Sequence, residues 1–382
     1  MKQVAAIVAN YAFPSYGQQI ADRFLAGYPH NGKWRRPAIE IVSLCAGRKP
    51  AGDLSAERAR EFGFQVYPSI AEALRRGRDR LAVDGVLITG EATGPDAVHG
   101  FFQQCVEVFE KDGRAAPVYA GPRLSAAFAE AKSMVDAARR LRFPMLAGSP
   151  LPLTWRLPDV ELPLHCEIEA ALMVGAATPE AADYEVLEAL QCMVERRKGG
   201  ETGVRAVQSL EGDAVWRAGE EGRWSKELLI AALSRSDSPQ GWSITDGRTQ
   251  DLVGNHELPK LVKNPVACLI EYRSGLRAAL LMLDGAVKDL TFAARVKTTK
   301  SVVSTQFFLG PPPDRSHFAC LAAKIDELVE TGRAPYPVER ALLVSGLVES
   351  CLESRRQGQR RISTPQLAVR YSAPAQSQYC RA

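Results

Sequence analysis

Apolar positions in the first 149 residues fall into short continuous runs, and stretches with the amphipathic spacing of helices separate these runs. Continuous apolar runs are typical of strands buried on both faces of a parallel sheet. The predicted strands are residues 4–9, 37–47, 65–67, 83–89, 116–121 and 143–149. Because helical stretches alternate with them, the pattern predicts an α/β domain with a parallel, doubly wound sheet.

The rest of the chain follows a different pattern, which predicts an α+β domain. Its predicted strands are residues 166–175, 266–272, 276–283, 287–296 and 303–309, and its predicted helices are residues 181–197, 222–236, 316–331 and 337–357. Hairpin signals stand at Ser274-Gly275 and Asp284-Gly285. We therefore expect one open, mainly antiparallel sheet with helices on one face.

These patterns divide the chain into a first domain, 1–149, and a second domain, 150–358. The boundary near residue 149 coincides with the proline-rich stretch LPLTWRLPDVELPL. The remaining residues, 359–382, are polar, and we expect this tail to lie along the surface or on a partner.

Composition excludes several classes of protein. The 382 residues are 46% hydrophobic, which is enough for two domains with cores of their own. The formal net charge of +4 gives no reason to expect nucleic acid. No apolar stretch approaches the length of a membrane span, and Asn10 ends the first apolar run too early for a signal peptide.

The 8 cysteines show no metal-ligand spacing. Most of them lie in apolar runs, where a free cysteine behaves as a small buried hydrophobe. We therefore expect no metal site and a reduced, cytoplasmic setting.

The turn after the first strand carries the first evidence on function. In a dinucleotide-binding (Rossmann-type) unit this turn reads G-x-G-x-x-G, because glycine permits the tight turn and lets the backbone touch the pyrophosphate. Residues 10–17 here read NYAFPSYG, with three aromatic residues and a proline where the phosphates need bare backbone. The sequence thus predicts the strand and the helix of such a unit without its usual glycines.

The end of the second strand also lacks an expected group. NAD enzymes place an Asp or Glu there to bind the ribose hydroxyls, whereas this chain has Ala46 and Gly47, followed by Arg48. Arg48 is either a contact for a ribose phosphate or a solvated loop residue. The residues that we assign to any cofactor contact are Asn10, Tyr11, Arg48 and Glu91.

Four stretches resemble the Gfo/Idh/MocA family, which includes glucose–fructose oxidoreductase and inositol dehydrogenase. They are residues 117–149 (beginning PVYAGPRLS and ending FPMLAGS), 187–204 (LEALQCMVERRKGGETGV), 207–216 (VQSLEGDAVW) and 336–358 (YPVERALLVSGLVESCLESRRQG). Family members typically move a hydride between NAD(P) and a sugar, cyclitol or similar polyol. The resemblance implies a Rossmann-type domain followed by an open-sheet domain for substrate and oligomer contacts.

The family's functional positions are altered in this chain. Its E-K-P motif, whose lysine polarises the reacting group, maps onto Gly121, Pro122 and Arg123, so that Pro122 replaces the lysine. Arg123 can bind an anion but is a poor proton shuttle. The family's Asp and His, four residues apart, map onto Asp183 and Leu187, so the histidine is absent; in a nearby branch its position falls on Glu185.

Several residues remain as candidates for chemistry. The catalytic candidates are Asp183, Glu185, Glu188 and Arg123, and the substrate-binding candidates are Trp155, Arg156, His99 and Tyr184. Glu185 and Glu188 share a helix face and could act as an acid/base pair or hold a cation. The alternatives are acidic residues that only stabilise a helix start, a packed domain junction at Trp155, and a structural His99.

Two hypotheses follow from the sequence. The first is a divergent, redox-impaired family member that binds NAD(P) weakly or not at all. It would be a non-catalytic subunit, in a homo-oligomer or beside an active homologue, joined through the apolar face of the open sheet. The second is an active NAD(P)-dependent oxidoreductase, or a lyase or hydratase, that acts on a sugar, cyclitol or related polyol.

Overall fold

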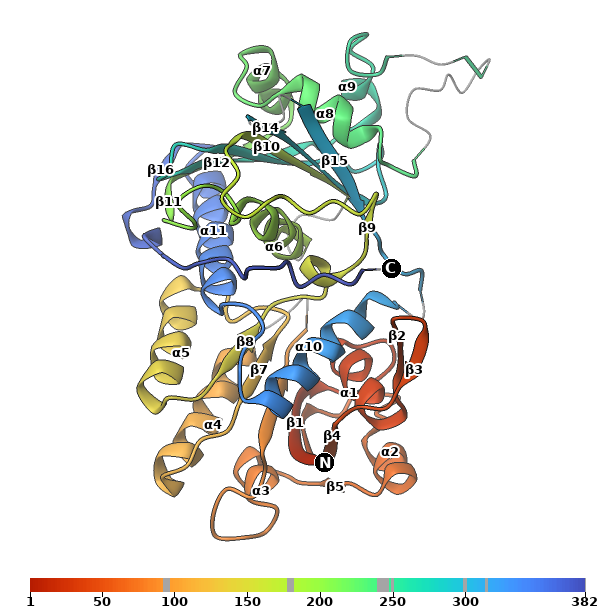
Figure 1. Cartoon of the computed structure of the whole chain (residues 1–382), viewed down its shortest axis with the longest axis vertical. Helices are drawn as coiled ribbons and strands as arrows, with labels where there is room; N and C mark the ends of the chain where they lie inside the picture. The colour runs from red at the N-terminus through yellow and green to blue at the C-terminus, as the bar shows by residue number, and fades with distance from the viewer. Residues whose placement is uncertain are drawn as a thin grey trace. The chain divides into compact units, whose positions relative to one another are not determined.

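The computed structural model describes residues 1–91, 97–176, 182–238, 247–248, 251–297, 301–312 and 315–381. The chain forms two compact units, which Figure 1 shows in sequence colours. The first comprises Met1–Leu153 and Gly310–Ser345, and the second comprises Thr154–Leu309 and Gly346–Arg381. The sequence predicted domains at 1–149 and 150–358 and a tail at 359–382. That these ranges fold separately stays a prediction.

The first unit contains the predicted parallel sheet. Its strands are β5 (Gln65–Val66), β4 (Ile39–Arg48), β1 (Lys2–Asn10), β6 (Gly85–Thr89), β7 (Val118–Gly121) and β8 (Met145–Ala147), in that spatial order and all parallel. The order runs outward from β1 in one direction and from β6 in the other. A crevice for ligands in such sheets forms where the direction changes, at the carboxyl ends of these two strands.

Helices connect these strands in the predicted alternation. They are α1 (Tyr16–Ala26), α2 (Ser55–Phe62), α3 (Ile70–Arg75), α4 (Val98–Asp112) and α5 (Phe128–Leu141). A small hairpin of β2 (Tyr28–His30) and β3 (Lys33–Arg35), which the sequence did not predict, follows α1. The α/β fold predicted for this part of the chain is confirmed.

The first unit also includes α10 (His317–Thr331) and the start of α11 (Glu339–Arg356). Asp326 on α10 is fully buried and accepts hydrogen bonds from the backbone N–H groups of Ala38 and Ile39, at 2.9 and 3.2 Å. The Arg35 guanidinium donates to the same carboxylate at 2.7 Å. A buried charge with three donors is well compensated, and it fixes α10 to the start of β4.

The second unit contains the predicted, mainly antiparallel sheet. Its strands are β16 (Ile362–Ser363), β11 (Val204–Glu211), β12 (Val266–Tyr272), β13 (Arg277–Met282), β10 (Ile168–Gly175), β14 (Leu290–Val296), β15 (Ser301–Phe307) and β9 (Arg156–Leu157), in spatial order. Only the pairing of β10 with β13 is parallel among the pairings described. Both edge strands are very short, which leaves little backbone open for pairing with another chain.

Helices cover both faces of this sheet, which corrects the prediction of a single covered face. On one face lie α6 (Ala182–Val194) and the second half of α11. On the other face lie α7 (Asp213–Glu220), α8 (Lys226–Leu233) and α9 (Leu258–Leu261), as Figure 1 shows. Leu172, Leu269 and Leu281 of the sheet form one apolar core with Leu229 and other residues of these helices. The apolar sheet face expected to bind a partner is therefore covered by the chain itself.

The polar tail lies along the second unit. Ile362 and Ser363 pair with β11, and the Tyr371 hydroxyl donates to Glu195 at 2.8 Å while it accepts from Gln191 at 2.8 Å. Arg196 donates to the carbonyl of Pro374 at 2.9 Å. These contacts hold the tail along the surface of the second unit, which is the first of the two alternatives that the sequence left open.

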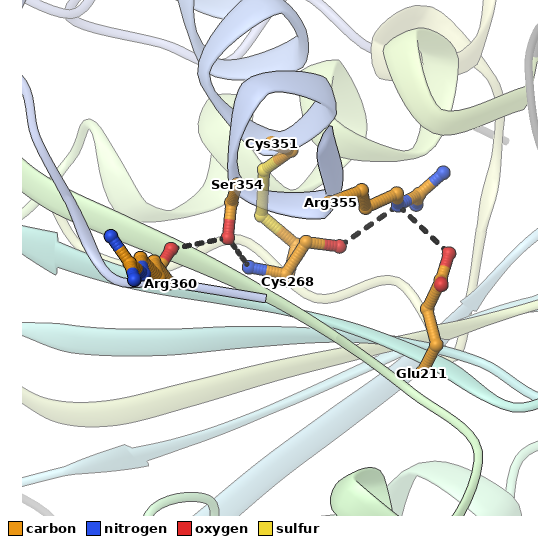
Figure 2. Close-up of a disulfide and its surroundings, with 7 residues drawn as sticks. Glu211, Cys268, Cys351, Ser354, Arg355 and Arg360 are labelled. Carbon is orange, nitrogen blue, oxygen red and sulfur yellow. Dashed lines mark hydrogen bonds and ion pairs between the residues drawn. A yellow bond between two sulfur atoms is a disulfide. The ribbon is translucent and has the colours of Figure 1, made fainter. Parts of the chain in front are cut away.

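A disulfide joins Cys268 on β12 to Cys351 on α11 (Figure 2), with 6.6 Å between the Cα atoms. Beside it, Ser354 accepts from the backbone N–H of Ser209 at 2.9 Å and donates to the carbonyl of Arg360 at 2.6 Å. The prediction that the cysteines are separate buried thiols is wrong for this pair. Sequence spacing gave no indication of it, because 83 residues separate the two positions.

We predict that the double replacement Cys268→Ala and Cys351→Ala lowers the free energy of unfolding by about 4 kcal/mol, since the cross-link closes a long loop in the unfolded chain. Urea unfolding of the oxidised wild type and of the variant measures this difference. Reducing agent should lower the stability of the wild type by more than it lowers that of the variant. Equal stability of the two proteins under oxidising conditions would contradict the prediction.

Candidate functional site

The turn between β1 and α1 is closed by its own side chains. Ser15 caps α1, because its hydroxyl accepts from the backbone N–H of Gln18 at 3.1 Å. Tyr11 is fully buried, and its hydroxyl donates to Asp22 on α1 at 2.5 Å. Burial, and then the Asp22 carboxylate, raise the pKa of Tyr11 far above its ordinary value. Tyr11, assigned from the sequence to a cofactor contact, thus has an internal hydrogen bond.

Glu91 lies at the N-terminus of α1. Its carboxylate accepts from the side-chain amide of Asn10 at 2.6 Å and from the backbone N–H of Tyr16, the first residue of the helix. Asn10 ends β1 and Glu91 follows β6, so the pair joins the two strands between which the sheet order reverses. Burial raises the pKa of Glu91, and the Tyr16 hydrogen bond opposes that shift in part. Asn10 and Glu91 were both predicted from the sequence to be cofactor contacts. In the structure their side chains are hydrogen-bonded to each other.

A helix N-terminus at this crevice is the place where Rossmann-type folds bind the phosphates of a dinucleotide. In this chain a carboxylate of the protein is already hydrogen-bonded there. The first turn of α1 therefore binds a carboxylate of the protein itself, Glu91.

One glycine of the usual fingerprint is present, although the sequence predicted a turn without these glycines. A Cβ atom on Gly17 would lie 2.7 Å from the carbonyl oxygen of Asn10, so only glycine allows α1 to pack this closely on β1. This is the role of the third glycine in G-x-G-x-x-G. Counting back by that spacing places Ala12 and Pro14 where the first two glycines would stand.

The end of β4, where a ribose would be bound, offers no carboxylate. Arg48 is the last residue of the strand and is exposed. The ring of Phe101 lies so close to Gly47 that a Cβ atom there would be 2.7 Å from it. Asp53, further along the loop, accepts from the Ser55 hydroxyl at 2.8 Å.

The position of the family's lysine carries no amine, whether it falls on Gly121 or on Pro122. If the proline of E-K-P is aligned with Pro122, the lysine falls on Gly121, and with the alignment of the sequence analysis it falls on Pro122. A Cβ atom on Gly121 would lie 2.6 Å from Cζ of Tyr119. The Tyr119 hydroxyl is held by the carbonyl of Gly148, to which it donates at 2.9 Å, and by the Tyr16 hydroxyl at 3.0 Å. Neither alignment supplies an amine, and the adjacent Arg123 is half-buried.

The other candidates lie at separate places. Tyr184, Glu185 and Glu188 are on α6, where Tyr184 and Glu188 are buried and Glu185 is half-buried. Asp183 is also in α6, but its side chain lies outside the described part. His99 on α4 contacts Glu130 at 3.6 Å and the Ser133 hydroxyl at 3.4 Å.

Trp155 and Arg156 contact other residues of the second unit. The Trp155 ring packs edge-on against Phe308, with 6.0 Å between the ring centroids. Arg156 is buried, donates to the carbonyl of Val160 at 2.9 Å, and lies 3.9 Å above the ring of Tyr379. Substrate binding by either residue stays a prediction.

Within the described ranges, no three His, Cys, Asp or Glu side chains come together as a metal site would require. The same part of the chain contains no helix with the length and apolar character needed to cross a membrane.

Comparison with known proteins places the fold. Solved structures with the same fold include GenD2 from gentamicin A biosynthesis in complex with NAD, at 14% identity and a TM-score of 0.59, covering 95% of this chain and 96% of that one. A probable dehydrogenase from Thermotoga maritima matches at 12% identity and a TM-score of 0.57, covering 96% and 99%. A myo-inositol dehydrogenase from Lactobacillus casei, in complex with NAD(H) and myo-inositol, matches at 10% and 0.58, covering 95% and 97%. No family model and no curated protein matches the sequence.

These likenesses run over nearly the full length of both chains. The chain therefore has the two-domain fold of the Gfo/Idh/MocA-type dehydrogenases, at low sequence identity, as the resemblance implied.

We predict that Gly121→Ala lowers the free energy of unfolding by about 1–3 kcal/mol, because the added Cβ atom meets the Tyr119 ring in a packed core. Gly100→Ala on α4 is the matched control, since nothing lies within 4 Å of a Cβ atom there, and alanine favours a helix. Chemical denaturation measures both variants. If Gly121→Ala is as stable as Gly100→Ala, the lysine position is open.

The raised pKa of Glu91 predicts a pH dependence. A carboxyl whose pKa is higher in the folded than in the unfolded state makes the fold more stable as it takes up its proton. Relative to Glu91→Gln, the wild type should therefore gain stability as the pH falls from 7 through the raised pKa towards the ordinary value of 4.5. Thermal unfolding at a series of pH values measures this, with Glu107→Gln, an exposed α4 residue, as control. A wild type that loses stability relative to Glu91→Gln over this range would contradict the assignment.

Proposed function

We propose that this chain is a redox-impaired relative of the NAD(P)-dependent sugar and polyol dehydrogenases, and that it serves as a non-catalytic subunit beside an active homologue. The observation that carries the proposal is the Glu91 carboxylate at the N-terminus of α1, bound by Asn10 and Tyr16. The fold supports the wider class, because its structural neighbours include GenD2 in complex with NAD and a myo-inositol dehydrogenase in complex with NAD(H).

Electrostatics explains why Glu91 weakens dinucleotide binding. A pyrophosphate at this helix N-terminus would stand within a few ångströms of the carboxylate. Two like charges about 4 Å apart repel by about 4 kcal/mol at the effective dielectric constant of a protein surface, which corresponds to roughly a thousandfold loss of affinity. Protonating or displacing Glu91 reduces this cost, but displacement leaves the Asn10 amide and the Tyr16 N–H without their partner.

Proton transfer to the substrate is impaired independently. A positioned acid or base contributes about a hundredfold to ten-thousandfold in rate. The lysine position carries Gly121 or Pro122, and the packed Tyr119 ring leaves no room for a side chain at Gly121. A chain altered at both the cofactor and the proton-transfer positions is suited to a structural or regulatory role.

The partner subunit is part of this proposal, either as a second copy or as an active homologue. Because α7, α8 and α9 cover one face of the second sheet, the contact must use another surface than the apolar sheet face expected from the sequence. A cytoplasmic setting is also proposed. The buried thiols of Cys45, Cys105 and Cys166 favour a reducing setting, whereas the Cys268–Cys351 disulfide is more typical of an oxidising one.

The alternative is an active NAD(P)-dependent oxidoreductase, or a lyase or hydratase, on a sugar-like substrate. The retained Gly17 favours it, because the close packing of α1 on β1 is kept, and so does the buried carboxylic side chain of Glu188. Alanine replacement of Asp183, Glu185 and Glu188 tests this alternative, since loss of an observed activity in any of the three would support it.

We predict that NADH and NADPH give no saturable fluorescence change with the purified protein up to about 1 mM, the upper end of ordinary KM values. The physical reason is the repulsion between Glu91 and the pyrophosphate. Co-purification with a homologue that retains the lysine and the glycine turn would support the partner role. Tight binding of either nucleotide, together with turnover of a polyol, would contradict the proposal.

A further inference from the structure

A pocket of about 300 Å³ opens in the second unit, where the segment after α8 meets the ends of β14 and β15. Its described lining includes Asp237, Lys288, Asp289, Gln306 and Phe308. This volume lies at the small end of the range for ligand sites. Thr291 pairs directly with Gln306 on one side and with Val174 on the other, so the three side chains lie on the same face of the sheet. Val174 belongs to the core that α8 covers. The pocket is therefore on the face of the sheet that carries α8.

One wall of the pocket is a fixed row of hydrogen-bond acceptors. The side-chain amide of Gln306, a buried residue, donates to Asp237 at 2.7 Å and to Asp289 at 3.0 Å. Because its two hydrogens serve the two carboxylates, the Gln306 side chain offers only its carbonyl oxygen to a ligand. Asp289 is held further by the Ser236 hydroxyl at 2.9 Å and by the backbone N–H of Asp237 at 2.5 Å.

A buried hydroxyl beside this wall has no hydrogen-bond partner among the described residues. Thr291 is fully buried, pairs directly with Gln306 across the ladder, and keeps its Oγ1 atom unsatisfied. Directly opposed residues of antiparallel strands place their side chains on the same face, about 5 Å apart. Buried polar atoms are nearly always hydrogen-bonded, so an orphaned one points to a bound molecule or water at that place.

Another part of the pocket lining is aromatic. Phe308 lines it, and Trp155 packs edge-on against the Phe308 ring. An aromatic surface of this kind can pack against the C–H face of a ring-shaped ligand. The charged residues of the described lining are two carboxylates, Asp237 and Asp289, and one exposed ammonium, Lys288. The guanidinium of the neighbouring Arg235 donates to the Ser304 hydroxyl at 2.9 Å, so the lining itself favours a positively charged ligand.

We propose that this pocket binds a small hydroxylated ring that carries a protonated amine, such as an amino sugar. The amine would donate to Asp237 and Asp289, the hydroxyls to Gln306, and the ring would lie against Phe308. This site belongs entirely to the second unit and does not depend on the dinucleotide crevice or on the proposed function.

Glucosamine and glucose are the probes, because glucosamine differs from glucose in its amine. Saturation-transfer NMR and titration calorimetry with the full-length protein should show saturable binding of glucosamine, at least about tenfold tighter than that of glucose, as expected for charge-assisted hydrogen bonds. Asp237→Asn should remove most of this preference. Asp213→Asn on α7, which removes one exposed charge away from the lining, should not.

Two further variants keep the test decisive if Asp237→Asn is poorly folded. Lys288→Ala, at an exposed position, should strengthen glucosamine binding by removing the like charge. Phe308→Ala should weaken both sugars. The proposal is overturned if neither sugar binds, if glucose binds as tightly as glucosamine, or if Lys288→Ala weakens the binding of glucosamine.

Discussion

The N-terminus of α1 is the constraint on which this account depends. Backbone N–H groups and the helix dipole make it an anion site, and the sheet order places it at the crevice between β1 and β6. In this chain, the anion is the protein's own Glu91 carboxylate. Because the same N–H group cannot serve a carboxylate and a phosphate at once, the fold of a dinucleotide-binding unit is kept while its ligand position is occupied.

The position of the catalytic lysine and the face of the second sheet are also filled by the chain's own side chains. Tyr119 fills the space beside Gly121 that a lysine side chain would need. In the second unit, α7, α8 and α9 form a core with one face of the mainly antiparallel sheet, so the hydrophobic surface that suggested a partner contributes to the stability of the chain itself. The tail and the Cys268–Cys351 disulfide add local and covalent links within that unit.

Much of the fold could be predicted from the sequence, because the local pattern of apolar residues indicates most of its strands and helices. Continuous apolar runs identified the central parallel strands, and the turn signal at Ser274-Gly275 identified the hairpin of β12 and β13. The hairpin predicted at Asp284-Gly285 is wrong, because β10 lies between β13 and β14 in the sheet. Helix α7 of the covering layer was missed because residues 201–216 (ETGVRAVQSLEGDAVW) read as a strand and a turn, whereas α7 begins directly after Gly212. With 8 residues, α7 is shorter than the window of about 11–18 residues in which helical periodicity is read.

The site was predictable only in part. The bulky residues in the turn 10–17 and the missing amine were visible in the sequence. The contact between Asn10 and Glu91 spans 81 residues and exists only because β1 and β6 are neighbours, so no local pattern indicates it. For the same reason, the pocket at Gln306 and the disulfide pair became apparent only in three dimensions, and the packing role of Gly17 became apparent only from its distance to Asn10.

The most direct test is a crystal structure of the protein grown with a large excess of NAD. This account predicts Glu91 hydrogen-bonded to Asn10 and Tyr16, with no dinucleotide density at the start of α1. A pyrophosphate bound to the first turn of α1, with the Glu91 side chain displaced and the nicotinamide ring lying near Gly121 and Pro122, would contradict it.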